Sequence, residues 1–179
     1  MPANSYESRL AEMFSQCAAE MLVDLGAQAS RLEGDRQPRP TAEDIAAFVS
    51  FGNAELHGSL TLLAPRKLFS GLHPVTPTAP PSDMEDWASE MVNMAVGRFR
   101  NRLASYAVKV IFGVPHNVTA ELLHFSSGLE PGGSLISFAV DNMVLDCWLV
   151  LEAEPDFWLA DSPMEEIEKA LAEGTLVLF

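Results

Sequence analysis

The sequence is poor in positive charge. It contains 11 Lys and Arg residues against 25 Asp and Glu residues, and its formal net charge is −14 at pH 7. Nucleic-acid binding needs clustered basic side chains that contact phosphate groups. The composition therefore argues against nucleic acid as a partner, and equally against an anionic membrane surface. The excess of acidic residues is explained most simply by a solubilising surface.

Long apolar runs and cysteine are also scarce. No stretch of about 18 apolar residues occurs, so we expect no transmembrane helix. The first residues, MPANSYESRLAEMF, lack a basic segment followed by an apolar one, and no signal peptide is visible. The two cysteines, Cys17 and Cys147, lie far apart in apolar contexts, which indicates buried free thiols in a reducing compartment. These features predict a cytoplasmic protein.

Several common catalytic and metal-binding patterns are missing. The four histidines have no partner at zinc-ligand spacing, so we expect no metal site in this chain. No GxSxG motif is present, and no Ser-His-Asp set can be argued from spacing. The glycine-rich segment GLEPGGS lacks the lysine of a phosphate-binding loop and is most simply a hairpin turn.

The order of predicted helices and strands along the chain indicates a single domain of the α+β class over residues 1–179. Apolar residues make up 48% of the chain, which is ample for a core. We expect an antiparallel sheet of about five to six strands with long helices packed on one face. Apolar periodicity, turn residues and capping signals place the expected helices at about 4–32, 65–72, 83–108 and 163–173, and the strands at 45–51, 55–64, 117–127, 134–142, 143–153 and 175–179.

The expected helix at 83–108 carries a polar stripe. At about 100° per residue, Asp86, Glu90, Asn93 and Gly97 fall within an arc of roughly 60°. Glycine costs roughly 1 kcal/mol relative to alanine inside a helix, and asparagine competes for backbone hydrogen bonds there. The stripe is therefore a candidate for close approach of another molecule. The plainer interpretation is a solvated helix face on which Gly97 lets a neighbouring strand approach.

Two arginines of the same helix do not fit this division into a polar and an apolar side. Arg98 and Arg102 both fall toward the apolar arc. Either the helix rotates toward its end, or these side chains meet acidic groups.

The helix resembles the signature helix of the CheC/CheX/FliY phosphatase family of bacterial chemotaxis. The family pattern is Asp or Ser, three residues, Glu, two residues, Asn, and it stands here as Asp86, WAS, Glu90, MV, Asn93, followed by MAVG with Gly97. Upstream, FVSFGNAELHGSLTLLAP resembles the strand-turn-strand of the family. The resemblance covers about residues 44–150, and its single motif copy is closer to CheX than to CheC. Residues 155–179 are a C-terminal extension without a match.

The resemblance implies a substrate and a set of roles. The substrate would be the phosphoaspartate of a CheY-type receiver domain, and Mg²⁺ would be carried by that receiver. Asn93 would orient the attacking water, Glu90 would dock on a receiver lysine, Asp86 would extend this acidic contact, and Gly97 would keep the approach unobstructed. The resemblance also implies a homodimer.

Two other functions remain compatible with the sequence. The chain could be a non-catalytic receiver-binding or dimeric adaptor module, in which Asn93 would be dispensable. The likeness to FliY also permits a structural subunit of a larger signalling or motor-switch assembly, although no switch-binding domain is apparent.

Overall fold

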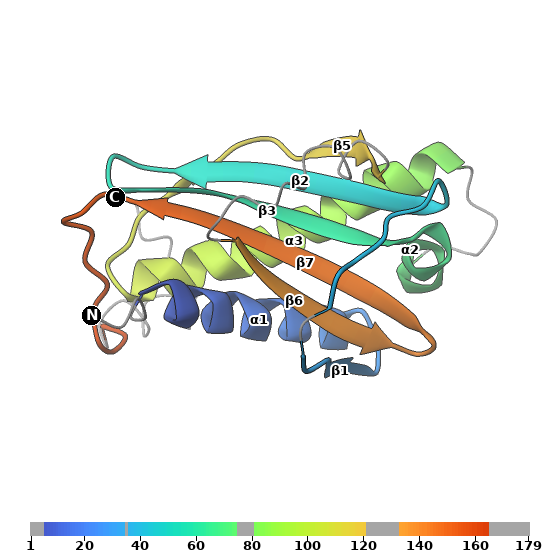
Figure 1. The fold of residues 1–179 in the computed structure, drawn as a ribbon, viewed down its shortest axis with the longest axis horizontal. Helices are drawn as coiled ribbons and strands as arrows, with labels where there is room; N and C mark the ends of the chain where they lie inside the picture. The colour runs from blue at the N-terminus through green and yellow to red at the C-terminus, as the bar shows by residue number, and fades with distance from the viewer. Residues whose placement is uncertain (1–5, 35, 75–80, 121–132, 165–179) are drawn as a thin grey trace.

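The computed structural model describes residues 6–34, 36–74, 81–120 and 133–164, and these form an antiparallel sheet with helices on one face (Figure 1). The α+β class predicted from the sequence is confirmed. Within these described residues the sheet has seven strands, compared with the five or six predicted. In chain order the elements are α1 (Tyr6–Asp24), β1 (Ala29–Arg31), β2 (Asp44–Gly52), β3 (Leu56–Pro65), α2 (Arg66–Leu72), α3 (Pro81–Ser105), β4 (Ile111–Phe112), β5 (His116–Thr119), β6 (Gly133–Val140) and β7 (Met143–Ala153).

The centre of the sheet is built from the long strands β2, β3 and β7. The strand order is β1-β6-β7-β3-β2-β4, and β5 also pairs with β2. Asn53 closes the β2–β3 hairpin, because its side-chain oxygen accepts hydrogen bonds from the backbone N–H groups of Glu55 and Leu56, both at 2.7 Å. The strand-turn-strand predicted for this region is therefore confirmed.

The main core lies between the sheet and the two long helices. In β2, alternate residues such as Val49 and Phe51 face the helices, as expected for a strand with period two. Phe99 of α3 lies between Phe51 of β2 and Phe14 of α1. The ring centroid of Phe99 is 6.1 Å from that of Phe51 and 5.5 Å from that of Phe14, and the ring planes are near-perpendicular in both pairs. One aromatic cluster thus joins both helices to the sheet.

Both cysteines belong to this core and form no disulfide, as predicted. Burial raises the pKa of the Cys17 thiol to about 11 and also raises the pKa of the Cys147 thiol. Both groups therefore stay protonated at neutral pH.

The first helix is shorter than predicted. It ends at Asp24 rather than near residue 32, because Gly26 adopts a positive φ of 77° and residues Ala29–Arg31 pair with β6 as β1. With three residues in β1 and two in β4, these strands are too short to show a strand pattern, which explains the larger strand count.

The third helix also ends earlier, at Ser105 rather than about residue 108. Ala107 adopts a positive φ of 64°, and the N–H of Val108 donates to the carbonyl of Leu103 at 3.0 Å, as in a helix C-terminal cap. The expected helix 163–173 and strand 175–179 fall almost wholly outside the described residues.

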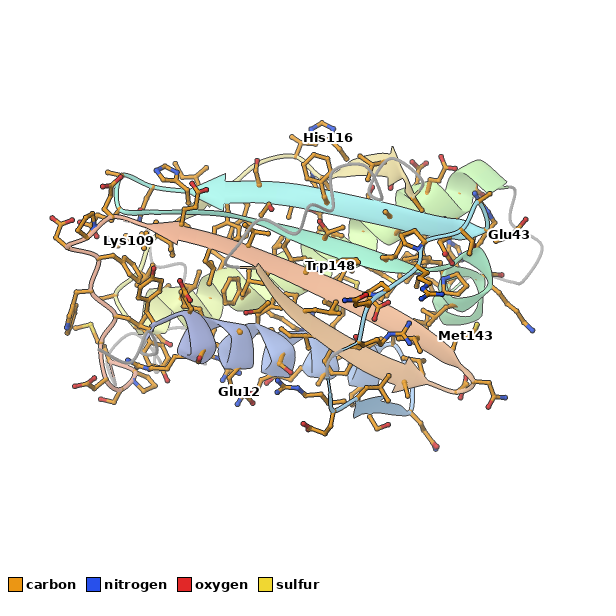
Figure 2. All side chains as sticks on the ribbon, in the orientation of Figure 1. Glu12, Glu43, Lys109, His116, Met143 and Trp148 are labelled. Carbon is orange, nitrogen blue, oxygen red and sulfur yellow. The ribbon has the colours of Figure 1, made fainter. Side chains whose placement is uncertain are left out.

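The face of the sheet away from the helices carries a smaller apolar cluster, formed by Ala46, Leu63, Ala120, Val118 and Trp148. Figure 2 shows Trp148 near the middle of the sheet and His116 at its outer edge.

The connection from β1 to β2 crosses this second face (Figure 1). Arg36, in that connection, contacts Asp146 of β7 through two hydrogen bonds of 3.2 and 3.3 Å. Asp146 is 4% exposed, and its carboxylate also accepts a 2.6 Å hydrogen bond from the Ser137 hydroxyl. The carboxylate therefore anchors an otherwise irregular, proline-rich segment on the sheet.

We expect Arg36→Ala to lower the free energy of unfolding by about 1–3 kcal/mol, because it leaves a buried carboxylate without its charged partner. Arg39→Ala is the matched control, since Arg39 lies exposed on the same connection, and its effect should stay below about 0.5 kcal/mol. Urea unfolding curves measure both. Equal effects of the two variants would show that the Asp146 contact does not anchor the connection.

Candidate functional site

Helix α3 divides cleanly into a buried and an exposed side. Its buried apolar residues repeat at three- and four-residue steps and lie against β2, β3 and α1: they are Met84, Ala88, Met91, Val92, Ala95, Val96, Phe99 and Leu103. The side chains of Asp86, Glu90 and Asn93 are all exposed on the other side. The structure therefore places three of the four predicted site residues together on one solvent-facing stripe.

The geometry of the stripe follows from the helix. Glu90 and Asn93 are separated by about 4.5 Å along the axis, and residues at this spacing have Cβ atoms about 5–6 Å apart. Within the described part of the chain, Asp86, Glu90 and Asn93 form no hydrogen bond or ion pair, so their polar atoms face solvent. The carboxylate and the amide are thus available to one common partner.

Gly97 lies in the same stripe, one turn after Asn93. A Cβ atom built at Gly97 would meet no described atom within 4 Å. No neighbouring strand in the described residues therefore accounts for this glycine, so that part of the plainer interpretation is not supported, whereas a solvated helix face agrees with the exposure of Asp86, Glu90 and Asn93. The space above Gly97 is open to an approaching molecule.

Contacts on both flanks hold α3 in a fixed rotation. On one flank the Ser89 hydroxyl lies 3.1 Å from the side-chain oxygen of Asn117 in β5, a contact that sequence spacing did not indicate. On the other flank Trp87 packs edge-to-face on His73, with ring centroids 5.1 Å apart. A helix held this way presents its exposed side chains with defined direction, as a catalytic or binding site requires.

The two arginines that did not fit the sequence pattern meet acidic groups on α1. Arg98 forms an ion pair with Asp24, and Arg102 contacts Glu20 at 2.9 Å. Of the two explanations left open by the sequence, the acidic partners are the correct one. A local pattern cannot show that two distant helices lie side by side, so this pairing could not be predicted.

Two features of the described residues bear on other functions. No group of three or more His, Cys, Asp or Glu side chains is placed to hold a metal ion there. No helix in the described ranges is long and apolar enough to cross a membrane.

No protein-family model matches the chain, and no curated protein matches it in sequence. Its fold, however, is similar to solved chemotaxis proteins. The chemotaxis protein CheX from Vibrio vulnificus aligns with a TM-score of 0.63 and 13% identity, over 83% of this chain and 100% of the other. CheX from Desulfovibrio desulfuricans aligns with a TM-score of 0.62 and 15% identity, over 80% and 99% of the two chains.

A third solved structure, the CheX-CheY-BeF3-Mg²⁺ complex from Borrelia burgdorferi, aligns with a TM-score of 0.60 and 12% identity, over 79% of this chain and 97% of the other. At sequence identities of 12–15%, this structural similarity establishes the fold and nothing further. The chain has a CheX-like fold, and the resemblance to the CheC/CheX/FliY family that its sequence predicted is confirmed at that level.

Proposed function

We propose that this protein hydrolyses the phosphoaspartate of a CheY-like receiver domain. The observation that carries the proposal is the exposed pair of Glu90 and Asn93 on α3, beside the open space at Gly97, in a CheX-like fold. The structural neighbour from Borrelia, which is a CheX bound to CheY with BeF3 and Mg²⁺, supports the choice of partner.

The reaction needs a positioned water. The water oxygen forms a bond to phosphorus while the bond from phosphorus to the aspartyl oxygen breaks. The electron pair of that bond returns to the receiver carboxylate, and the proton of the water leaves with inorganic phosphate or to solvent. The amide of Asn93 has both a donor and an acceptor, so it can hold the water in line without acting as a strong base. Positioning of this kind contributes several kcal/mol to catalysis.

Glu90 supplies the docking contact in this proposal. A carboxylate forms charge-assisted hydrogen bonds with an ammonium group, so Glu90 would pair with a receiver lysine and set the register of the two surfaces. Asp86, one turn toward the N-terminus, would extend the same acidic contact. The Mg²⁺ that neutralises phosphoryl charge would belong to the receiver. The homodimer and the cytoplasmic location expected from the sequence belong to the same proposal.

We expect Asn93→Ala to lower phosphate release from a receiver charged with acetyl phosphate by at least about 100-fold, because the attacking water loses its orientation. Stability should not fall, since alanine is the better helix former. Asn101→Ala is the matched control, because Asn101 is exposed on the same helix two turns later, and it should retain the wild-type rate. An Asn93→Ala rate equal to that of the wild type, with a verified receiver, would refute the catalytic role.

Glu90→Arg separates binding from turnover. We expect it to abolish capture of the phosphorylated receiver in a pull-down, because like charges would then face each other, whereas Asn93→Ala should still capture it. If the wild type captures the receiver without releasing phosphate, the non-catalytic adaptor is the correct function. If Glu90→Arg binds normally, the docking surface lies elsewhere.

Substitutions at Gly97 test whether the receiver comes close to α3 at this position. Gly97→Ala should raise the free energy of unfolding by about 0.5–1 kcal/mol, because alanine is the better helix former and its methyl group meets no described atom. Gly97→Leu should fold as well but lower phosphate release at least tenfold, because its side chain occupies the approach. The matched control is Gly71→Leu at the end of α2, where a Cβ atom also meets nothing within 4 Å. Similar rates for both leucine variants would exclude close approach at Gly97.

A further inference from the structure

The end of α3 carries three arginines in alternate positions, and they are not equivalent. Arg98 and Arg102 are engaged by Asp24 and Glu20 of α1. Arg100 lies between them in sequence, is exposed, and has no hydrogen bond or ion pair with any other described residue. Arg98 and Arg102 therefore link α3 to α1, whereas Arg100 makes no such contact with the described residues.

Arg100 belongs to the same stripe as the proposed site. It follows Asn93 by seven residues, which is about two turns, so the two residues lie within about 20° of each other in projection and about 10 Å apart along the axis. The position midway between them is Gly97. From its N-terminal end, the stripe thus contains two acidic residues, then the amide of Asn93. Gly97, which has no side chain, separates this amide from the cation of Arg100.

The direction of helical side chains brings Arg100 closer to Asn93 than this axial distance suggests. Long side chains on a helix lean toward its N-terminus and cover the turn before their own Cα atom. For Arg100 that turn contains Gly97, where no side chain blocks the path and a Cβ atom would meet only open space. The guanidinium can therefore extend over Gly97 toward the space beside the Asn93 amide.

The electrostatics of the domain give this cation a role. The chain carries a net charge of −14, and Asp86 and Glu90 place two acidic side chains on the stripe itself. A phosphoryl group is also anionic, so a cation on this surface would offset the repulsion between Asp86 and Glu90 and the part of the phosphoryl charge that the receiver's Mg²⁺ leaves unbalanced. Arginine suits the task, because its planar donors match phosphoryl oxygens and it remains charged at all relevant pH values.

We propose that Arg100 reaches across Gly97 and donates hydrogen bonds to the phosphoryl oxygens of the receiver while Asn93 holds the attacking water. This inference rests on the proposed function and adds a second catalytic group to it. Arg100 takes no proton and forms no covalent bond; it stabilises negative charge on the phosphoryl oxygens as the bond to the aspartyl oxygen breaks. Arginine side chains play this part in other phosphoryl-transfer enzymes.

The test compares Arg100→Gln and Arg100→Lys with Arg39→Gln in phosphate release from the charged receiver. Arg39→Gln is the matched control, because it also removes one exposed arginine charge, from the connection that crosses the other face of the sheet. We expect Arg100→Gln to lower kcat by about 10- to 100-fold with KM changed less than about threefold. Arg100→Lys should recover part of kcat, and Arg39→Gln should match the wild type.

The outcomes separate this inference from the proposed function. If Arg100→Gln turns over at the wild-type rate while Asn93→Ala does not, the proposed function stands and the role of Arg100 is wrong. A rise in KM alone would mean that Arg100 docks on an acidic group of the receiver, which also overturns the inference. If Asn93→Ala is as active as the wild type, the proposed function itself fails. Thermal unfolding of each variant checks that none of these results reflects loss of the fold.

Discussion

The rotation of α3 about its own axis is the constraint on which the candidate site depends. It is set by burial of one apolar side of the helix, centred on Phe99, which contacts Phe51 of the sheet and Phe14 of α1. Burying an aromatic side chain of this size stabilises a fold by about 2–3 kcal/mol, so a rotated helix would lose far more than it could gain. Because the apolar side is fixed in this way, the opposite side, with Glu90 and Asn93, must face solvent.

Two ion pairs add to the orientation of α3 that burial of its apolar side sets. The ion pairs of Arg98 and Arg102 with α1 link the two helices at the border between buried and exposed surface. Surface ion pairs contribute little stability individually, but these two define which edge of α3 is closed by α1. On the opposite flank the contact between Ser89 and Asn117 fixes the helix against β5. The stripe is therefore a solvent-facing strip of α3 with contacts to other elements along both of its edges.

The two faces of the sheet play different parts in this arrangement. One face carries the helices and so determines the site. The other carries a small apolar cluster and the buried carboxylate of Asp146, whose contacts with the exposed Arg36 and with Ser137 hold the connection from β1 to β2. A buried carboxylate in an apolar region needs such partners, since an unpaired charge there is strongly destabilising. The connection matters for the site only indirectly, because it delivers the chain to β2, the strand on which α3 lies.

The sequence by itself determined the type and order of most elements, the polar stripe of α3 and the resemblance to the CheC/CheX/FliY family. These features are local, because periodicity, turn residues and a short motif each depend on residues that are close together in the sequence. The end of α1 at Asp24 and the short strands β1 and β4 could not be read in this way, because pairing with distant strands overrides local preference. The tertiary structure alone decided that Arg98 and Arg102 bind α1 while Arg100 does not, and that Gly97 faces open space. Contacts between residues far apart in the chain depend on how helices and sheet pack, and no single segment carries that information.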